Sequence, residues 1–316
     1  MTDFEKTAKT TPVVGRFAPT PSGRLHLGNL MCAMLAWLSA KSAGGQILLR
    51  IEDLDLARCP FMGENTKYLL EDLAWMGMDF DGEVLWQSQR SEIYDIYFRK
   101  LQEEGLIYPC YCSRAELHAA TAPHRSDGEP LYDRKCWHRL QAGVPAPTTR
   151  KPAYRVRVPD ALYGFDDGLQ GRYEENLERD CSDFVVRRSD GVYAYQLAVV
   201  VDDGLSAVNE VVRGNDLLNS TPRQMFLQEK FGFSHPVYRH IPLLTDADGR
   251  RLSKRDGDGC MEIVRERYKD ARPVIGALAA ALGLIPSPES VTLEQLLPLF
   301  DWKKIPRDAV CLPQGF

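Results

Sequence analysis

The chain has 316 residues, 44% of them hydrophobic and 26% charged, a size that predicts roughly two domains or one large domain with insertions. Its apolar runs fall short of the roughly 18 residues that span a bilayer, and the polar start MTDFEKTAKTTP lacks the apolar core of a secretory signal. We therefore expect a cytoplasmic protein without a membrane partner, and the net charge of −5 means that a nucleic acid would have to meet a local basic surface.

The segment RFAPTPSGRLHLGN, residues 16–29, holds two prolines, two glycines and one histidine just before an apolar helical pattern. Proline fixes φ, and glycine permits close backbone approaches. The pattern runs from Leu30 to Ser42 and stops at Gly44-Gly45. The segment is thus a shaped loop that leads into a helix N-terminus, where free N–H groups and the helix dipole favour anions. It predicts a phosphate site.

Strands and helices then alternate along the chain. QILLRIEDLD, residues 46–55, predicts a buried strand that ends in carboxylates, and residues 64–77 and 91–105 predict helices. Such alternation favours an α/β fold with a parallel sheet. After a break at about residues 108–179, regular patterns resume: DFVVRRSDGVYAY predicts a hairpin that turns at Ser189-Asp190-Gly191.

These patterns divide the chain into four parts. We expect the first half of an α/β domain at residues 1–107, an inserted subdomain at 108–180, the second half of the α/β domain at 181–260 and a helical C-terminal region at 261–316. Cysteine, proline and glycine punctuate the insertion, and a long polar loop, LLTDADGRRLSKRDGD, precedes the C-terminal region.

Three of the eight cysteines predict a metal site. Scattered cysteines in a reducing compartment are mostly small buried hydrophobic residues, but Cys110 and Cys112 form a Cys-x-Cys pair that Cys136 follows closely. Three thiolates and one further ligand make a closed, structural zinc site. From chemistry alone, His124 or His138 would be the fourth ligand, because imidazole binds zinc more readily than phenol does.

Two loops are expected to work together. HLGN, residues 26–29, suits phosphate placement, and RLSKR, residues 251–255, offers the mobile ammonium of Lys254. An α/β sheet would bring both to the carboxyl ends of its strands, where nucleotides bind. A charged loop that closes over a triphosphate stabilises the charge that develops when the α-phosphate is attacked.

These two loops resemble the signatures of class I aminoacyl-tRNA synthetases, in the form used by glutamyl enzymes. The resemblance continues through RIEDLD, WQSQR, AYQLAVVVDD and EVVRGNDLL and covers most of residues 13–260. Within this class the chain is most similar to the truncated glutamyl-queuosine tRNA(Asp) synthetase family. Two positions depart from the general pattern: Asn29 replaces the second histidine and Arg251 the first lysine of the late loop. Glutamyl-type enzymes also carry a small residue at the first of these positions.

The substrate assigns chemistry to particular residues. The α-ammonium of glutamate needs an acid, for which the resemblance implies Glu52. Its side-chain carboxylate needs an arginine, for which the resemblance implies Arg213, with Arg16 as the other candidate. A structural salt bridge is the alternative for Arg213. The resemblance implies Tyr132 as the fourth zinc ligand. It also implies catalytic roles for His26 and Lys254, an ATP site at Pro19, His26, Gly28, Asn29 and Lys254, and a glutamate site at Arg16, Phe17, Ala18, Pro19, Thr20, Glu52, Tyr195 and Arg213.

The implied activity joins glutamate to a tRNA. Glutamate would react with ATP, accompanied by Mg²⁺, to form glutamyl-adenylate, and then pass to the queuosine base of tRNA(Asp). Ordinary glutamyl enzymes continue into a large anticodon-binding region, whereas 56 residues follow Cys260 here. The alternatives are a short glutamyl-tRNA synthetase that reads the acceptor stem and a non-catalytic paralogue that binds RNA or glutamate. We expect a monomer with one structural zinc per chain.

Overall fold

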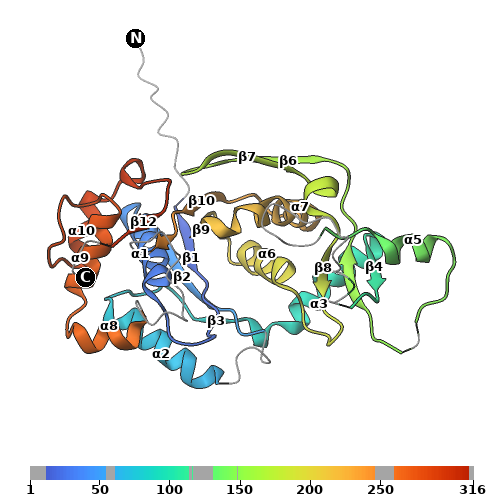
Figure 1. Ribbon diagram of the computed structural model, residues 1–316, viewed down its shortest axis with the longest axis horizontal. Coiled ribbons are helices and arrows are strands. Elements are labelled where there is room, and N and C mark those ends of the chain that lie inside the picture. The colour runs from blue at the N-terminus through green and yellow to red at the C-terminus, as the bar shows by residue number, and fades with distance from the viewer. Residues whose placement is uncertain are drawn as a thin grey trace, which may run out of the picture.

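The computed structural model of the protein describes residues 12–54, 61–113, 116, 131–147, 149–245 and 260–312. A parallel sheet forms its centre (Figure 1). Its strands are β1 (Val14–Phe17), β2 (Gln46–Ile51), β3 (Leu85–Trp86), β9 (Glu210–Gly214) and β10 (Val237–Ile241). β2 pairs with β1 and β3, and β9 pairs with β10. The Asn209 N–H donates to the Val14 carbonyl over 3.0 Å, so β9 starts beside β1. The predicted α/β fold with a parallel sheet is confirmed.

The strands lie side by side in the order β3-β2-β1-β9-β10, and the direction in which the chain adds strands changes between β1 and β9. From β1 the chain builds outward to β2 and β3, whereas β9 and β10 extend the sheet on the other side. Ligands of open α/β sheets bind at such a switch point, beyond the carboxyl ends of the strands. The topology therefore places a binding site beside the residues that follow β1, β2 and β9.

Helices pack on both sides of the strands. The long ones are α1 (Leu27–Ser42), α2 (Met62–Trp75), α3 (Ser91–Glu103), α6 (Tyr195–Leu205) and α7 (Thr221–Phe231). α2 and α3 match the predicted helices. α1 begins at Leu27 rather than Leu30, because the Asn29 side chain accepts from the His26 N–H over 3.2 Å and extends the first turn. It ends at Ser42, and Gly44 takes a positive φ of 65°.

The insertion forms a small lobe at one end of the molecule (Figure 1). Its antiparallel sheet contains β4 (Ile107–Cys110), β5 (Ala153–Val156) and β8 (Phe184–Arg187), and α5 (Lys135–Gln141) lies against β4. β8 thus belongs to this sheet although it lies beyond residue 180. The predicted turn after β8 forms, since the Gly191 N–H donates to the Arg188 carbonyl. Its second arm is a single bridge from Arg187 to Tyr193, because α6 begins at once.

A long hairpin leads from the lobe back to the central sheet. It consists of β6 (Leu162–Asp167) and β7 (Gly171–Asn176), followed by a π-helical turn, Leu177–Cys181. Figure 1 shows it crossing the molecule to reach β10, where the Gly168 N–H donates to the Tyr238 carbonyl over 2.8 Å. Part of the inserted sequence therefore packs on the central sheet.

The C-terminal region packs against α1. It contains the predicted helices, as α8 (Met261–Arg267), α9 (Arg272–Ala281) and α10 (Leu293–Leu296), and a short strand, β12 (Val310–Cys311), that pairs with β11 (Leu244–Thr245). The Trp302 indole donates to the Ser39 hydroxyl of α1 over 2.9 Å. Short 3₁₀ turns occur at Gln87–Gln89, Asn215–Ser220, Leu297–Leu299 and Trp302–Lys304. Among the helices described, we find none with the length and apolarity needed to cross a membrane.

Candidate active site and metal centre

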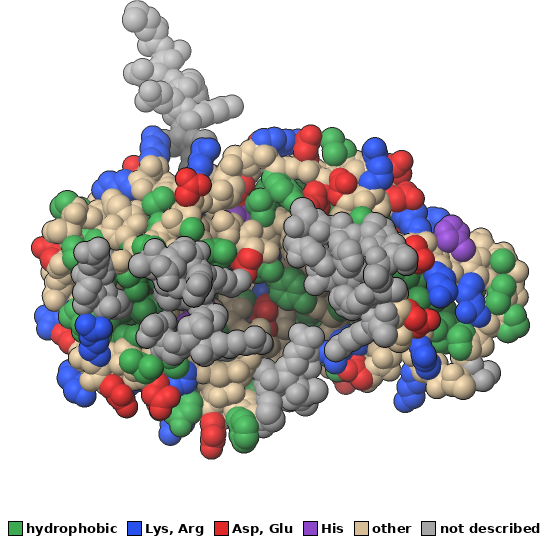
Figure 2. Space-filling view, in the orientation of Figure 1, with side chains coloured by type: hydrophobic (Ala, Val, Ile, Leu, Met, Phe, Trp, Pro, Cys, Tyr) green, Lys and Arg blue, Asp and Glu red, His purple; other side chains and the backbone are tan. Residues whose placement is uncertain are grey.

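A cavity of about 510 Å³ opens at the switch point of the sheet. Figure 2 shows a hollow near the centre of the face turned to the viewer. Every described residue that the sequence predicts for ATP or glutamate lines this cavity: Arg16, Phe17, Ala18, Pro19, Thr20, His26, Gly28, Asn29, Glu52, Tyr195 and Arg213. They come from β1 and its loop, the start of α1, the end of β2, the start of α6 and β9. The fold therefore gathers one site from five separate segments.

The start of α1 forms one wall. A Cβ atom on Gly28 would approach the His26 ring to 3.1 Å, so glycine leaves room for this ring beside the first turn. Cys260 forms a β-bridge with His26, and Leu244 lines the cavity. These two residues flank the segment that carries RLSKR. Lys254 and Arg251 themselves lie outside the described residues.

A buried charge network holds the acidic side of the cavity. The Arg50 guanidinium donates to Glu52 over 3.1 Å and to Asp203 over 2.5 Å, and Arg16 approaches Asp203 to 3.5 Å. Burial raises the pKa of Glu52, and the charge of Arg50 only partly offsets this rise. Burial would also raise the pKa of Asp203, but Arg50 and Arg16 outweigh burial and lower it. Asp203 thus keeps a negative charge between two arginines.

Arg213 forms the opposite side and is 4% exposed. Its Nη1 donates to Gln224 over 2.8 Å, its Nη2 donates to Thr221 over 2.8 Å, and the Tyr195 hydroxyl lies 3.5 Å from Nη1. Its Nε donates to the His240 ring over 2.9 Å. Within the described part of the chain Arg213 makes no ion pair, so its positive charge is available to an anion in the cavity. This argues against the structural salt bridge.

The sequence interpretation assigned no role to several of these groups. Arg50 and Asp203 stand inside RIEDLD and VVVDD, and a charged residue within a buried strand or helix is the signal that singles them out. His240 and its partner Asp167 carry no such local signal, because they are 73 positions apart. Cys32 also lines the cavity, where burial raises the pKa of its thiol to about 11 and keeps it protonated.

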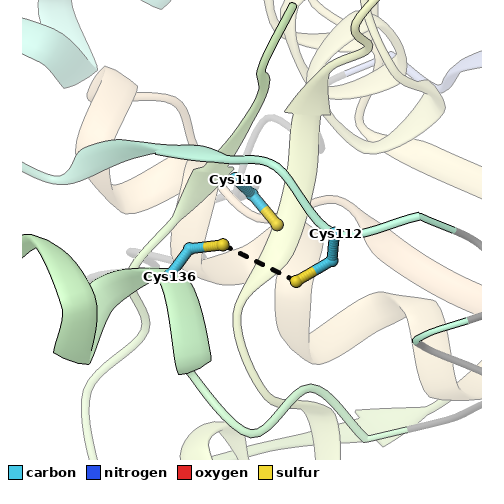
Figure 3. Close-up of side chains that lie close together, drawn as sticks. All are labelled: Cys110, Cys112 and Cys136. Carbon is cyan, nitrogen blue, oxygen red and sulfur yellow. Dashed lines mark hydrogen bonds between the residues drawn. The ribbon is translucent and has the colours of Figure 1, made fainter. Parts of the chain in front are cut away.

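The three predicted cysteines meet in the inserted lobe (Figure 3). The Cys110, Cys112 and Cys136 sulfur atoms all lie within 4.8 Å of one another, and Cys112 and Cys136 are 3.6 Å apart. Cys110 ends β4, Cys112 follows it, and Cys136 lies in the first turn of α5. This spacing fits one tetrahedral metal ion.

Tyr132 lies beside the three sulfur atoms. Its hydroxyl is 3.6 Å from the Cys110 sulfur and accepts from the Cys136 N–H over 2.9 Å. Burial raises the pKa of Tyr132, whereas a bound dication would favour the phenolate. His138 is exposed and lies outside the sulfur cluster. His124, the other histidine candidate, lies outside the described residues.

Arg155 supports this cluster from β5. Its Nε donates to the Cys110 sulfur over 3.3 Å, and its guanidinium lies 3.9 Å from the centre of the Tyr132 ring. The hydrogen bond from Cys112, and then the charge of Arg155, lower the pKa of Cys110 to about 4. Three thiolates and a phenol with a compensating cation are a donor set that suits Zn²⁺.

Comparison with known proteins gives the family. The family described as tRNA synthetases class I (E and Q), catalytic domain, matches residues 12–291. The glutamyl-Q tRNA(Asp) synthetase of Symbiobacterium thermophilum is 44% identical over 95% of both chains. The Geobacter sulfurreducens protein of that name is 44% identical over 88% of this chain and 87% of its own.

A solved structure agrees with these relatives. The glutamate tRNA ligase of Elizabethkingia meningosepticum, in complex with its amino acid, matches 96% of this chain and 67% of its own, with 25% identity and a TM-score of 0.77. The predicted resemblance is confirmed. With a matching catalytic domain, the switch-point cavity and relatives aligned over nearly their full length, the chain belongs to the class I tRNA synthetases, a family of ligases, and within them to the glutamyl-Q tRNA(Asp) synthetases.

Proposed function

We propose that the enzyme activates glutamate with ATP and transfers it to the queuosine base in the anticodon loop of tRNA(Asp). The observation that carries this proposal is that Glu52, which follows β2, and Arg213 of β9 line one cavity from either side of β1. Glu52 would meet the α-ammonium and Arg213 the side-chain carboxylate, and Arg16, Tyr195 and the segment 17–20 would complete the glutamate pocket. Relatives that align with 95% of this chain bear the name of this activity.

In the first step the α-carboxylate of glutamate attacks the α-phosphorus of ATP. A bond forms between them, the bond to the β-phosphate oxygen breaks, and pyrophosphate leaves. Pro19, His26, Gly28 and Asn29, at the start of α1, would hold the nucleotide, and His26 and Lys254 would stabilise charge that develops on the phosphates. Magnesium bound with ATP would neutralise part of this charge. Positioning suffices for this step, so it needs no covalent enzyme intermediate.

In the second step a hydroxyl group of the queuosine base attacks the carbonyl carbon of the adenylate. An ester forms, AMP leaves, and the hydroxyl proton passes to the departing phosphate or to water. The exposed basic side chains of the inserted lobe offer the local positive surface that RNA needs: Lys135, Arg139, Arg150, Lys151 and Arg157. Figure 2 shows Lys and Arg side chains at this end of the molecule.

We also propose that Cys110, Cys112, Tyr132 and Cys136 hold one structural Zn²⁺. The ion would join β4 to α5 and so shape the lobe that faces RNA. We also propose that the protein is a monomer and that it works in the cytoplasm.

The experiment that tests this function locates labelled glutamate. Purified enzyme should exchange pyrophosphate into ATP with glutamate alone, because the described residues proposed for both substrates line one cavity of the free protein. With ATP and queuosine-containing tRNA(Asp), label should remain after the 3′ end is removed. Label that leaves with the 3′ end would favour a short glutamyl-tRNA synthetase. An absence of both exchange and label would favour a non-catalytic paralogue.

A further inference from the structure

The tip of the β6–β7 hairpin meets β10 directly behind Arg213. Asp167 ends β6, and one of its oxygens accepts from the backbone N–H groups of Leu169 and Gln170, which fixes the turn. Its other oxygen lies 2.6 Å from Nδ1 of His240. Both side chains of this pair are fully buried. The inserted sequence therefore delivers a buried carboxylate to the back of the predicted glutamate site.

The hydrogen bonds determine which nitrogen of His240 carries its proton. Nε of Arg213 can only donate, and it lies 2.9 Å from Nε2 of His240. Nε2 must therefore accept, so the proton of the neutral ring is on Nδ1 and points to Asp167. Arg213 therefore donates to His240, and His240 donates to Asp167. A histidine held in this way fixes the orientation of the group it accepts from.

We propose that Asp167 and His240 are a positioning pair for Arg213, through which the hairpin of the insertion completes the glutamate site. The inference rests on the proposed function, because it assigns Arg213 to the side-chain carboxylate of glutamate. His240 accepts a hydrogen bond from Nε of Arg213, while Thr221 and Gln224 accept from its Nη atoms. The guanidinium is thereby fixed at three points before the substrate enters.

Protonation of His240 would undo this arrangement, because a proton on Nε2 would face the Arg213 donor. Burial lowers the pKa of His240, the charges of Arg213 and Arg16 lower it further, and the hydrogen bond to Asp167 only partly offsets them. The ring also stacks on Tyr238 of β10, 6.0 Å away, and touches Thr221 of α7. The ring thus stays neutral at neutral pH, and the KM for glutamate should rise only when the pH falls below the ordinary histidine range, about 6.5.

Asp167→Asn tests the pair in the full-length enzyme. The asparagine amide can donate to Nδ1, which favours the tautomer with its proton on Nε2, against Arg213. We expect the KM for glutamate to rise roughly 10-fold to 100-fold, the range for one hydrogen bond to a charged group, while kcat and the KM for ATP change less than about twofold. His240→Gln keeps an acceptor that can reach Arg213. It should raise the KM less, and its KM should rise less at low pH than that of the wild type, because the effect of protonating Glu52 is common to both proteins.

Two matched controls separate positioning from packing. Gln170→Ala removes a hydrogen bond of 2.8 Å from the same hairpin tip to the His240 carbonyl and should leave the glutamate KM near that of the wild type. His235→Gln replaces a surface histidine paired with Glu229 at 3.5 Å and should keep the pH profile. The inference is overturned if Asp167→Asn has a wild-type KM, or if Gln170→Ala raises the KM equally.

The proposed function can fail separately. If the wild-type enzyme showed no pyrophosphate exchange, the function would be wrong, and calorimetric binding of glutamate to the same variants would still decide whether the pair positions Arg213. A wild-type protein that binds no glutamate would overturn both.

Discussion

Tyr132 is the residue at which chemical expectation and family resemblance disagree. Imidazole is the commoner zinc ligand, yet the phenol is the group beside the cysteine sulfur atoms, and His138 is exposed. We expect Tyr132→Phe to lose zinc far more readily than the wild-type protein, because phenylalanine offers no oxygen ligand. Cys110→Ser should release zinc outright, since a serine hydroxyl is a poor ligand at neutral pH.

His138→Ala is the control for this prediction and should retain close to one zinc per chain. Zinc content after dialysis against a chelator measures all three variants. A His138→Ala protein without zinc, beside a Tyr132→Phe protein that keeps it, would show that the histidine is the ligand.

At the scale of elements, helix α6 carries two neighbouring carboxylates whose closest partners differ, although Arg50 lies within 4 Å of both. Asp202 is fully buried and accepts from Arg90 over 2.7 Å and from Tyr94 over 2.8 Å, which ties α6 to α3. Asp203 instead faces Arg16 and Arg50 at the cavity. We expect Asp202→Asn to lower the free energy of unfolding by about 3–5 kcal/mol, the cost of breaking a buried ion pair. Asp203→Asn also breaks a buried ion pair, so it should lower the free energy of unfolding too, but it should in addition raise the KM for glutamate.

Urea unfolding and steady-state kinetics on the same preparations separate the two effects. Asp95→Asn on α3 is the matched control: its carboxylate pairs with Arg99 at the surface, and the asparagine oxygen can still accept from Tyr193, so the change should cost less than about 1 kcal/mol. Equal destabilisation by the Asp202 and Asp95 variants would contradict this division of roles.

For the whole molecule, His240 makes stability depend on pH. The unfolded histidine has the ordinary pKa of about 6.5, and burial lowers the pKa in the folded state, so the unfolded chain binds more protons between these two values. The contribution of neutral His240 to the free energy of unfolding is therefore complete above about pH 6.5. It declines as the pH falls from there toward the pKa of His240 in the folded protein. Burial raises the pKa of Glu52, which acts in the opposite direction but is common to both proteins compared below.

Unfolding free energies of the wild type and His240→Gln between pH 7.5 and 5 would measure this term, over roughly the range in which histidine titrates. As the pH falls, we expect the free energy of unfolding of the wild type to decrease relative to that of the variant. A difference that stays constant across this range would mean that His240 does not titrate differently in the folded and unfolded states.

The sequence predicts those parts of the molecule that local patterns encode. Apolar runs and helical spacing predict β2, α1, α2 and α3, and the quoted motifs place eleven described residues in one cavity. The same patterns left QLAVVVDDGL without a helix assignment, although α6 covers it, because its apolar run has no clear period. The pairing of Asp167 with His240, and of β12 with β11, joins distant positions, and only the folded chain determines such contacts.

The hairpin that ends at Asp167 also limits how interchangeable the parts of this enzyme are. An insertion between two halves of a domain looks like a cassette that can be exchanged between relatives. Here the insertion supplies Asp167, the partner of His240 on β10. A chimera with an insertion from a relative would therefore keep this pair only if the hairpin tip and the histidine of β10 were transferred together. Grafts that end before β6 should keep the recipient's amino-acid preference, whereas grafts that include the hairpin without its histidine should weaken it.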